Sequence, residues 1–498
     1  MTWERYDIVI RGATVFDGTG APPFVSDIAI RADRIAALGK IEGAAGREID
    51  ARGLALAPGF IDVHSHDDFA VFTTPAMDFK VMQGVTTDVV GNCGMGAAPY
   101  DAVRAHFGMF FGEAALAGWR GYRGYLEAVD RDPPSLNVAA LVGHNTVRAA
   151  VTGMARRAPS VGELSAMRAI VREGMEAGAV GLSTGLIYEP GRHAATEEII
   201  ELAREAAAAG GLYATHMRNE ASGLLDAVRE TIRIGREAGA RVQISHHKAA
   251  GRRNWGRVRD SLALIEEARA RGLDVTADQY PYTSGSTVLS AVIHNNALNP
   301  QGDRGGVARV EPERVLIASA PAHPEYEGKT IAELAAQFGL PAEDAARKVD
   351  ADERGRTIAI LDLMDEGDVR AVMRHPTTMI GSDGIPLGGK PHPRLYGTFP
   401  RVLGRYAREA GLLTMEAAVH RMTGMAAAKF ELRERGVIRA GAFADLVVFD
   451  PATVVDTGTY HEPKRHPNGI AHVFVNGVAV VRDGRHTAAR PGRALRRG

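Results

Sequence analysis

Two histidines stand two residues apart in FIDVHSHDD, where His64 and His66 close an apolar run. Alternate residues of a strand face the same side, so both imidazoles can reach one cation. An isolated His-x-His is equally consistent with two incidental polar residues at the end of a strand. The pair is therefore a candidate metal site that needs further ligands elsewhere in the chain.

Four more residues of ligand type follow apolar runs: the only cysteine, Cys93, in VTTDVVGNCGMG, His216 in LYATHMRNE, His246 in VQISHHKAA and Asp383 in MIGSDGIP. Each alone has a simpler explanation, as a small buried hydrophobe, a hydrogen-bonded core histidine or a turn residue. Imidazole and thiolate together suit zinc. Zinc would acidify water and polarise a carbonyl, while Asp383 moves the proton from that water to a leaving amine.

The surrounding sequence repeats one unit: an amphipathic helix, a glycine, an apolar strand and a polar residue. Helices are predicted over residues 161–177, 197–209, 224–238 and 262–271, each followed at once by glycine. This alternation indicates parallel strands joined by helices. A doubly wound open sheet is the alternative, but no Gly-x-Gly-x-x-Gly phosphate motif follows a strand.

We therefore expect an α/β fold, a distorted (β/α)8 TIM barrel over residues 60–431, whose strand ends bring the six candidate residues to one mouth. The repeat fails in 285–364, which is predicted to be a lid inserted over the active site. Alternating strands at both ends of the chain, closed by Asn-Gly or Asp-Gly turns, predict a small β domain formed by residues 1–59 and 432–498.

The charge and hydropathy of the chain exclude several classes of partner. Its 59 basic and 60 acidic residues nearly cancel, so neither nucleic acid nor a membrane surface is expected to bind. No run of 18 apolar residues predicts a transmembrane helix, and the N-terminus lacks the apolar core of a signal peptide. A lone cysteine suits a reducing compartment. We expect a cytoplasmic protein with a small-molecule substrate, of undetermined oligomeric state, whose basic tail is solvated.

The sequence resembles the amidohydrolase superfamily, and more narrowly the D-aminoacylase (N-acyl-D-amino-acid deacylase) family, nearly from end to end. The resemblance is carried by PGFIDVHSHDD, QGVTTDVVGNCG, GLSTGLIYEPG, THMRNE, SHHK, DQYPYTSGST, GSDGIP and HPRLYGTFPRVLG. It implies zinc-dependent hydrolysis of N-acyl-D-amino acids to a D-amino acid and a carboxylate. The D configuration rests on the resemblance alone, because residue spacing does not distinguish D from L.

The resemblance also implies how the metal is held. Cys93, His216 and His246 would bind one zinc tightly, and His64 and His66 would form a second, weaker site bridged by Cys93. Many members of the superfamily bridge two metals through a carboxylated lysine on the fourth strand. The corresponding residues here, 174–191, contain no lysine, which favours the cysteine as the bridge.

For the substrate, the resemblance implies that Lys248, Tyr282 and Arg394 bind the α-carboxylate, which needs cationic donors once it leaves water. Tyr188 is a further candidate, for contact with the scissile carbonyl. The segment after DQYPYTSGST departs from the family pattern and makes the expected side-chain pocket more polar, through His294, Asn295 and Asn296. A preference for hydrophobic substrates is therefore not carried over.

Two other functions compete with this interpretation. A cyclic-amide hydrolase or a dipeptidase of the same superfamily is disfavoured by the missing lysine and by the presence of Lys248 and Arg394. A non-catalytic barrel scaffold would be expected to have lost metal ligands, and all of them are present.

Overall fold

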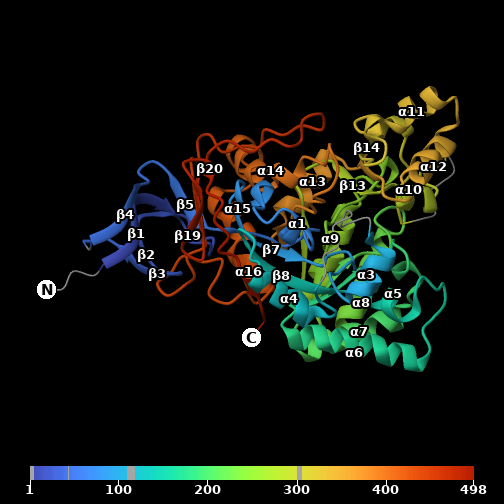
Figure 1. Cartoon of the computed structure of the whole chain (residues 1–498), viewed down its shortest axis with the longest axis horizontal. Coiled ribbons are helices and arrows are strands. Elements are labelled where there is room, and N and C mark those ends of the chain that lie inside the picture. The colour runs from blue at the N-terminus through green and yellow to red at the C-terminus, as the bar shows by residue number, and fades with distance from the viewer. Residues whose placement is uncertain (1–4, 43, 109–117, 300–305, 498) are drawn as a thin grey trace.

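The computed structural model describes residues 5–42, 44–108, 118–299 and 306–497. Its centre is a parallel barrel with helices outside it, as Figure 1 shows. The eight strands are β6 (Phe60–Asp62), β7 (Val85–Val90), β8 (Asn137–Gly143), β9 (Gly181–Gly185), β10 (Leu212–His216), β11 (Arg241–Ile244), β12 (Val275–Gln279) and β16 (Thr378–Ile380). The predicted barrel fold is confirmed.

The barrel strands pair in sequence order from β6 to β12, and β16 pairs with β12. A parallel bridge between Ser65 and Gly384, just beyond the ends of β6 and β16, nearly closes the ring. The bridge marks the seam between β6 and β16, and it places the loop after β6 beside the loop after β16. Residues from the two ends of the barrel sequence therefore meet at one mouth.

The helices between strands follow the predicted pattern. They include α6 (Val161–Ala177), α7 (Thr196–Ala208), α8 (Leu224–Ala238) and α9 (Val258–Ala270). A capping box between Ser160 and Glu163 starts α6, and Gly178 ends it in the left-handed conformation with φ of 107°. Only α9 begins well before its predicted start, by four residues, because Val258 and Ser261 are also buried against the barrel.

Strands from both ends of the chain form a separate mixed sheet, at the left of Figure 1. Its members are β1 (Arg5–Val15), β2 (Phe24–Arg31), β3 (Arg34–Gly39), β4 (Ala44–Asp50), β5 (Ala55–Pro58), β17 (Leu446–Phe449), β18 (Ile470–Val475), β19 (Val478–Arg482) and β20 (Arg485–His486). The Asn476-Gly477 turn has positive φ at both residues, which confirms the predicted Asn-Gly hairpin.

The basic tail runs along the protein surface, where the side chains of Arg490, Arg493 and Arg496 are exposed, in keeping with the expected solvated end. β21 (Ala494–Leu495) pairs in parallel with barrel strand β8. Arg493 Nη1 lies 2.7 Å from an Asp33 oxygen, and Arg496 Nη2 lies 2.7 Å from an Asp130 oxygen. The positive charges are therefore paired with acidic residues of both the terminal sheet and the barrel. The domain boundaries at 59/60 and 431/432 stay a prediction.

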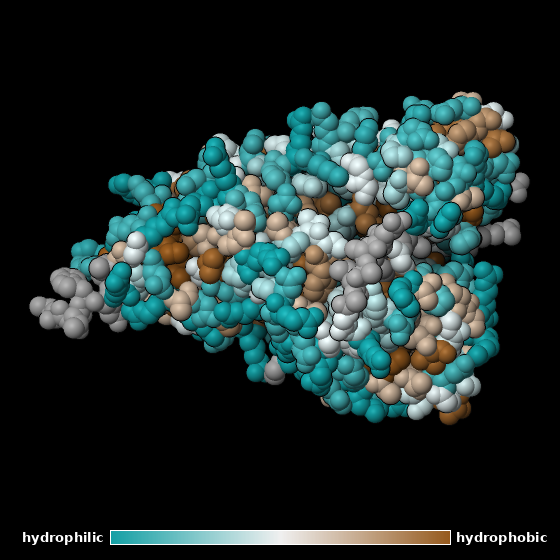
Figure 2. All heavy atoms as spheres, viewed as in Figure 1, coloured by the Kyte–Doolittle hydropathy of each residue, from teal (hydrophilic) through white to brown (hydrophobic). Residues whose placement is uncertain are grey.

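The segment between β12 and β16 forms its own small layer, at the upper right of Figure 1. An antiparallel sheet of β13 (Ser284–Val288), β15 (Ile358–Asp362) and β14 (Val315–Ser319) packs with α10 (Leu289–His294), α11 (Ile331–Phe338) and α12 (Ala342–Asp352). Residues 300–305 of the predicted lid lie outside the described residues. The face in Figure 2 is mostly hydrophilic, with separate apolar spots. No helix in the described part of the chain is long and apolar enough to cross a membrane.

Candidate metal centre and active site

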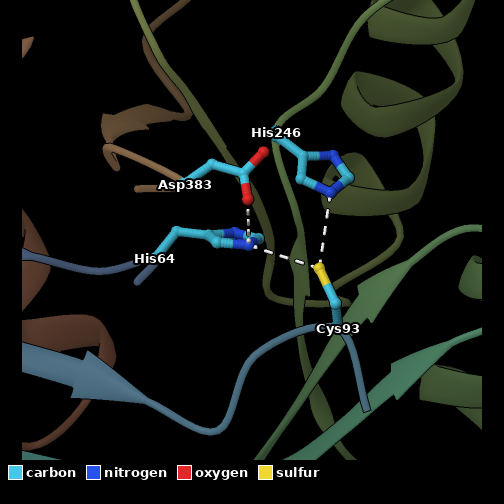
Figure 3. A group of neighbouring side chains, drawn as sticks. All are labelled: His64, Cys93, His246 and Asp383. Carbon is cyan, nitrogen blue, oxygen red and sulfur yellow. Dashed lines mark hydrogen bonds and ion pairs between the residues drawn. The ribbon is translucent and has the colours of Figure 1, made fainter. Parts of the chain in front are cut away.

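All six candidate residues lie at or just beyond the carboxyl ends of barrel strands. His64 and His66 follow β6, Cys93 follows β7, His216 ends β10, His246 follows β11 and Asp383 follows β16. In a (β/α)8 barrel these ends form one face, so the fold gathers residues separated by more than 300 positions. Figure 3 shows the side chains of His64, Cys93, His246 and Asp383 pointing toward one another.

The Cys93 sulfur is the centre of the cluster. It lies 3.4 Å from His64 Nε2, 3.6 Å from His216 Nδ1 and 3.5 Å from His246 Nε2. Tetrahedral zinc, with Zn–S of about 2.3 Å and Zn–N of about 2.0–2.1 Å, would separate sulfur from nitrogen by about 3.6 Å. The observed spacing therefore fits the donor set of a zinc site.

The chemistry of Cys93 also fits a metal-binding thiolate. Burial raises the pKa of the thiol, but the neighbouring His64 and His246 lower it by more, so the pKa of Cys93 lies well below its usual range. The residue has φ of 53°, left-handed backbone that few residues other than glycine adopt. A buried cysteine kept as a thiolate in a strained backbone is unlike an inert packing residue.

Asp383 lies between the two histidines of the His-x-His motif. Its Oδ1 is 3.1 Å from His66 Nε2 and 3.4 Å from His64 Nε2. Arg394 Nη1 lies 2.9 Å from its other oxygen. Burial would raise the pKa of Asp383, but Arg394 and the histidines lower it well below the usual range. The Asp383 carboxylate is thus a candidate base held beside the candidate metal ligands His64 and His66.

Glu220 is a buried site residue that sequence reasoning missed. Its carboxylate lies 2.9 Å from His246 Nδ1 and 3.5 Å from His216 Nε2, the ring nitrogens that face away from Cys93. A carboxylate on the outer nitrogen fixes the ring and tautomer of a metal-binding histidine. The signal was present in THMRNE, because Glu220 follows His216 by four positions.

Asp278 orients the ring of His64 in the same way. Its Oδ1 lies 3.1 Å from His64 Nδ1 and accepts the backbone N–H of His246 at 2.7 Å. Gln243 donates to its second oxygen at 2.8 Å. Asp278 is the last but one residue of β12, among residues that the repeat already marks as polar, but the sequence does not show which histidine it contacts.

Lys80 lies beneath the seam that joins the first and last strands. This residue of α2 (Asp78–Val81) has a fully buried side chain that donates to Asp62 and, at 3.0 Å, to Ser382 Oγ. Asp62 in turn accepts the backbone N–H groups of His64 at 3.2 Å and Ser382 at 2.8 Å. One buried ion pair therefore fixes both the His-x-His loop and the loop of Asp383. Nothing in DFKV distinguishes this lysine from a solvated one.

The two predicted cations occupy different positions. Lys248 lines the cavity at the candidate metal ligands His216 and His246, and its Nζ lies 2.5 Å from Glu220 Oε1. Arg394 is fully buried behind Asp383, where its guanidinium lies over the ring of Tyr280 at 4.4 Å. Within the described residues, Arg394 Nε has no hydrogen-bond partner. The guanidinium therefore retains a donor for an additional acceptor.

Of the two tyrosines predicted to bind substrate, Tyr188 lines the cavity and Tyr282 is not among its described lining residues. Tyr188 lines the cavity, packs edge-on against His216 with ring centroids 5.0 Å apart, and shares a 3.0 Å hydrogen bond with Thr287 Oγ1. Tyr282 is not brought there: it packs on His392, and its hydroxyl donates to Pro393 O at 3.5 Å. Tyr280, two residues earlier, lines the cavity instead.

The insertion covers this cavity with apolar side chains, Val307, Ala308, Leu361, Leu363 and Met364. His294 and Asn296 are exposed, and Asn295 turns away to accept the N–H of Gly306 at 3.0 Å. The three residues expected to make the pocket polar are therefore absent from the described lining of this cavity.

Two histidines left out of the predicted ligand set have other partners. His144 Nε2 lies 2.9 Å from a Glu198 oxygen, and His247 Nε2 lies 2.9 Å from Ser261 Oγ. The fourth barrel strand, β9, reads GLSTG and carries no lysine. Cys93 therefore remains the side chain placed between the two histidine pairs.

Comparison with known proteins agrees with the geometry. The amidohydrolase family pattern matches residues 47–481. The chain is 44% identical to a D-aminoacylase of Alcaligenes xylosoxydans xylosoxydans, over 99% of this chain and 98% of the relative.

Two solved structures superpose closely. One is a D-aminoacylase with a binuclear metal centre, studied for activation by one metal and attenuation by a second; its TM-score is 0.91 at 44% identity, covering 99% of this chain and 100% of that one. The other is an N-acyl-D-glutamate deacylase from Bordetella bronchiseptica, complexed with zinc and a phosphonate that mimics the tetrahedral intermediate. It also has a TM-score of 0.91, at 43% identity and the same coverage.

Proposed function

The chain belongs to the D-aminoacylase (N-acyl-D-amino-acid deacylase) family of amidohydrolases, and from this premise we propose that it is a zinc-dependent hydrolase of N-acyl-D-amino acids. The products are a D-amino acid and a carboxylate. The observation that carries the proposal is the position of Cys93, whose sulfur lies 3.4–3.6 Å from three histidine nitrogens.

Cys93, His216 and His246 would hold a zinc ion, which when bound would supply the Lewis acidity that activates water and polarises the substrate carbonyl. Asp383 takes the proton from the attacking water and delivers it to the leaving nitrogen. Arg394 keeps this carboxylate ionised, so it is ready to accept. His64 and His66 supply a second, weaker metal position on the other side of the cysteine.

The substrate's α-carboxylate binds at the cationic side of the cavity. Lys248 stands at its surface, and Arg394 offers the Nε donor that has no partner among the described residues. Tyr280 takes the place that the sequence suggested for Tyr282, because it lines the cavity beside both cations. Tyr188 contacts the substrate near the scissile carbonyl.

We further infer that the enzyme acts on its small-molecule substrate in the cytoplasm. The balanced charge gives no affinity for polyanions, and the single cysteine is committed to the metal rather than to a disulfide.

A panel of N-acetyl-D- and N-acetyl-L-amino acids, assayed with zinc added and after chelation, tests the proposed function. We expect D substrates to be hydrolysed, L substrates to be spared, and chelation to abolish turnover until zinc is restored. Equal turnover of both enantiomers would reject the D assignment. Full activity after verified metal removal would reject the zinc mechanism.

A further inference from the structure

A second cavity, of about 330 Å³, lies beside the one at the metal ligands. The two cavities share Ile187 and Tyr188 as lining residues. The other apolar walls of the second cavity include Met95, Met154, Val288 and Ala291. Met95 follows Cys93 by two residues, which places this wall on the metal-binding loop itself.

The described walls of the second cavity are mostly apolar. Ile187, Val288 and Ala291 are buried hydrophobic residues. Five ionisable side chains also border the cavity: His106, Arg156, Glu189, Arg192 and His294. Arg156 and His294 are exposed, and Arg156 Nη2 lies 3.7 Å from a Glu189 oxygen. The remaining described walls mainly offer hydrocarbon contact. A cavity of this composition suits an apolar group.

The structure of the substrate indicates which of its parts would enter the second cavity. The carbonyl carbon of an N-acyl amino acid carries the amino-acid nitrogen on one side and the acyl chain on the other. If the amino-acid part lies with Lys248 and the apolar lid residues, the acyl chain must leave past the opposite wall. Tyr188 lines both cavities and packs edge-on against His216, so the second cavity offers the acyl chain such a space.

We propose that the second cavity is an acyl subsite, and that the enzyme prefers N-acyl-D-amino acids with unbranched acyl chains of several carbons over N-acetyl substrates. This inference rests on the proposed function. The volume is at the lower end of the range for small-molecule sites, roughly 300–1,000 Å³. It accommodates an alkyl chain, but the apolar walls would not hydrogen-bond a peptide.

A chain-length series tests the subsite directly. The substrates are N-acetyl-, N-butanoyl-, N-hexanoyl- and N-octanoyl-D-leucine, and kcat/KM is measured for each with zinc-loaded wild type. We expect a rise of about fourfold for each buried methylene, equal to about 0.8 kcal/mol, until the cavity is filled. A flat or falling series, with N-acetyl-D-leucine still hydrolysed, overturns the acyl subsite alone. Failure to hydrolyse any member overturns the proposed function as well.

A variant pair locates the effect in this cavity. Met154, on the cavity wall, is 41% exposed, so Met154→Asp should fold while placing a charge beside the acyl chain. We expect it to lower kcat/KM for the octanoyl substrate by about tenfold or more and to leave the acetyl substrate within about twofold. Leu340→Asp, at 37% exposure between α11 and α12, makes the same change away from this wall and should alter neither.

Inhibition by the carboxylate products gives a readout that does not depend on turnover of long-chain substrates. With N-acetyl-D-leucine as substrate, octanoate should inhibit wild type far more strongly than acetate, and Met154→Asp should remove that difference. Equal inhibition by octanoate and acetate in wild type, or an unchanged octanoate advantage in Met154→Asp, would overturn the assignment of this cavity to the acyl chain.

Discussion

Lys80 Nζ lies 3.0 Å from Ser382 Oγ, across the seam between the first and last barrel strands. The same hydroxyl accepts the backbone N–H of Gly384 at 3.0 Å. Asp383 lies between Ser382 and Gly384 in the chain and has φ of 51°, which is left-handed backbone. The buried lysine therefore supports the strained turn that aims the proposed catalytic carboxylate at the candidate metal ligands.

Lys80→Met should lower kcat by about 10- to 100-fold while one zinc per chain is retained. The substitution leaves Asp62 and its acidic neighbours without their buried cation and removes the donor to Ser382. The measurement is kcat normalised to bound zinc, together with the melting temperature.

Arg435→Met is the matched control for Lys80. Arg435 also forms a buried ion pair, with Asp445, but between residues that border the terminal sheet. It should lower the melting temperature and leave kcat per zinc nearly unchanged. If Lys80→Met behaves in the same way, the lysine supports stability only.

Asp383→Ala should abolish turnover, by about 100- to 10,000-fold, because it removes the group that transfers the proton. Zinc content should persist, since Cys93, His216 and His246 remain. Activity is measured alongside metal analysis of the same sample. Near-normal turnover by the zinc-loaded variant would contradict the proton-transfer role.

Arg394→Ala should separate two effects of the guanidinium. Lost binding of the α-carboxylate should raise KM by about tenfold or more for N-acyl-D-amino acids but not for the corresponding amides. Lost support of Asp383 should lower kcat for both substrates, because the ion pair at 2.9 Å is gone. An equal rise of KM for acids and amides would exclude the carboxylate contact.

Cys93→Ser and His66→Asn should differ in the zinc they retain. The thiolate touches three histidine nitrogens, so Cys93→Ser should lose the tightly bound zinc and all activity. His66→Asn should keep one zinc per chain, because His66 belongs to the weaker position. Metal analysis after dialysis checks both. Loss of all zinc from His66→Asn would show that the assignment of the two positions is reversed.

Lys429→Met should stabilise the protein, and the gain should depend on pH. Burial lowers the pKa of Lys429 to about 8, although Asp274 at 3.0 Å opposes the shift. Between this value and 10.5 the unfolded chain binds more protons, so wild-type stability rises with pH through that window. At pH 7 the variant should gain up to roughly 3 kcal/mol, and the gain should shrink as pH approaches 10.

Unfolding in denaturant at several pH values measures the effect at Lys429. Lys40, with an 86% exposed side chain, supplies the control substitution Lys40→Met, which should show no such pH-dependent gain. A gain for Lys429→Met that stays constant from pH 7 to 10 would refute the burial of the charge as its cause.

Local patterns were sufficient to predict the barrel. Helix periodicity and the glycines that end helices are short-range signals, and Gly178 and Gly239 do adopt the left-handed conformation that ends α6 and α8. The alternation of helices and strands then predicts where each strand ends. The strand ends in turn predict which residues lie at the mouth of the barrel. The acidic partners of the arginine-rich tail, such as Asp33, could not be predicted, because a local run of charge does not reveal residues that lie hundreds of positions away.

The sequence by itself determined the candidate ligand types, because each of these residues stands at the end of an apolar run or just after it: His64, His66, Cys93, His216, His246 and Asp383. Only the tertiary structure decided which partners orient them. Glu220, Asp278 and Lys80 act through side-chain contacts across strands and helices, and such contacts leave no period in the chain. The same reason explains the tyrosines: both follow β12, and only packing decides that Tyr280 faces the cavity while Tyr282 faces His392.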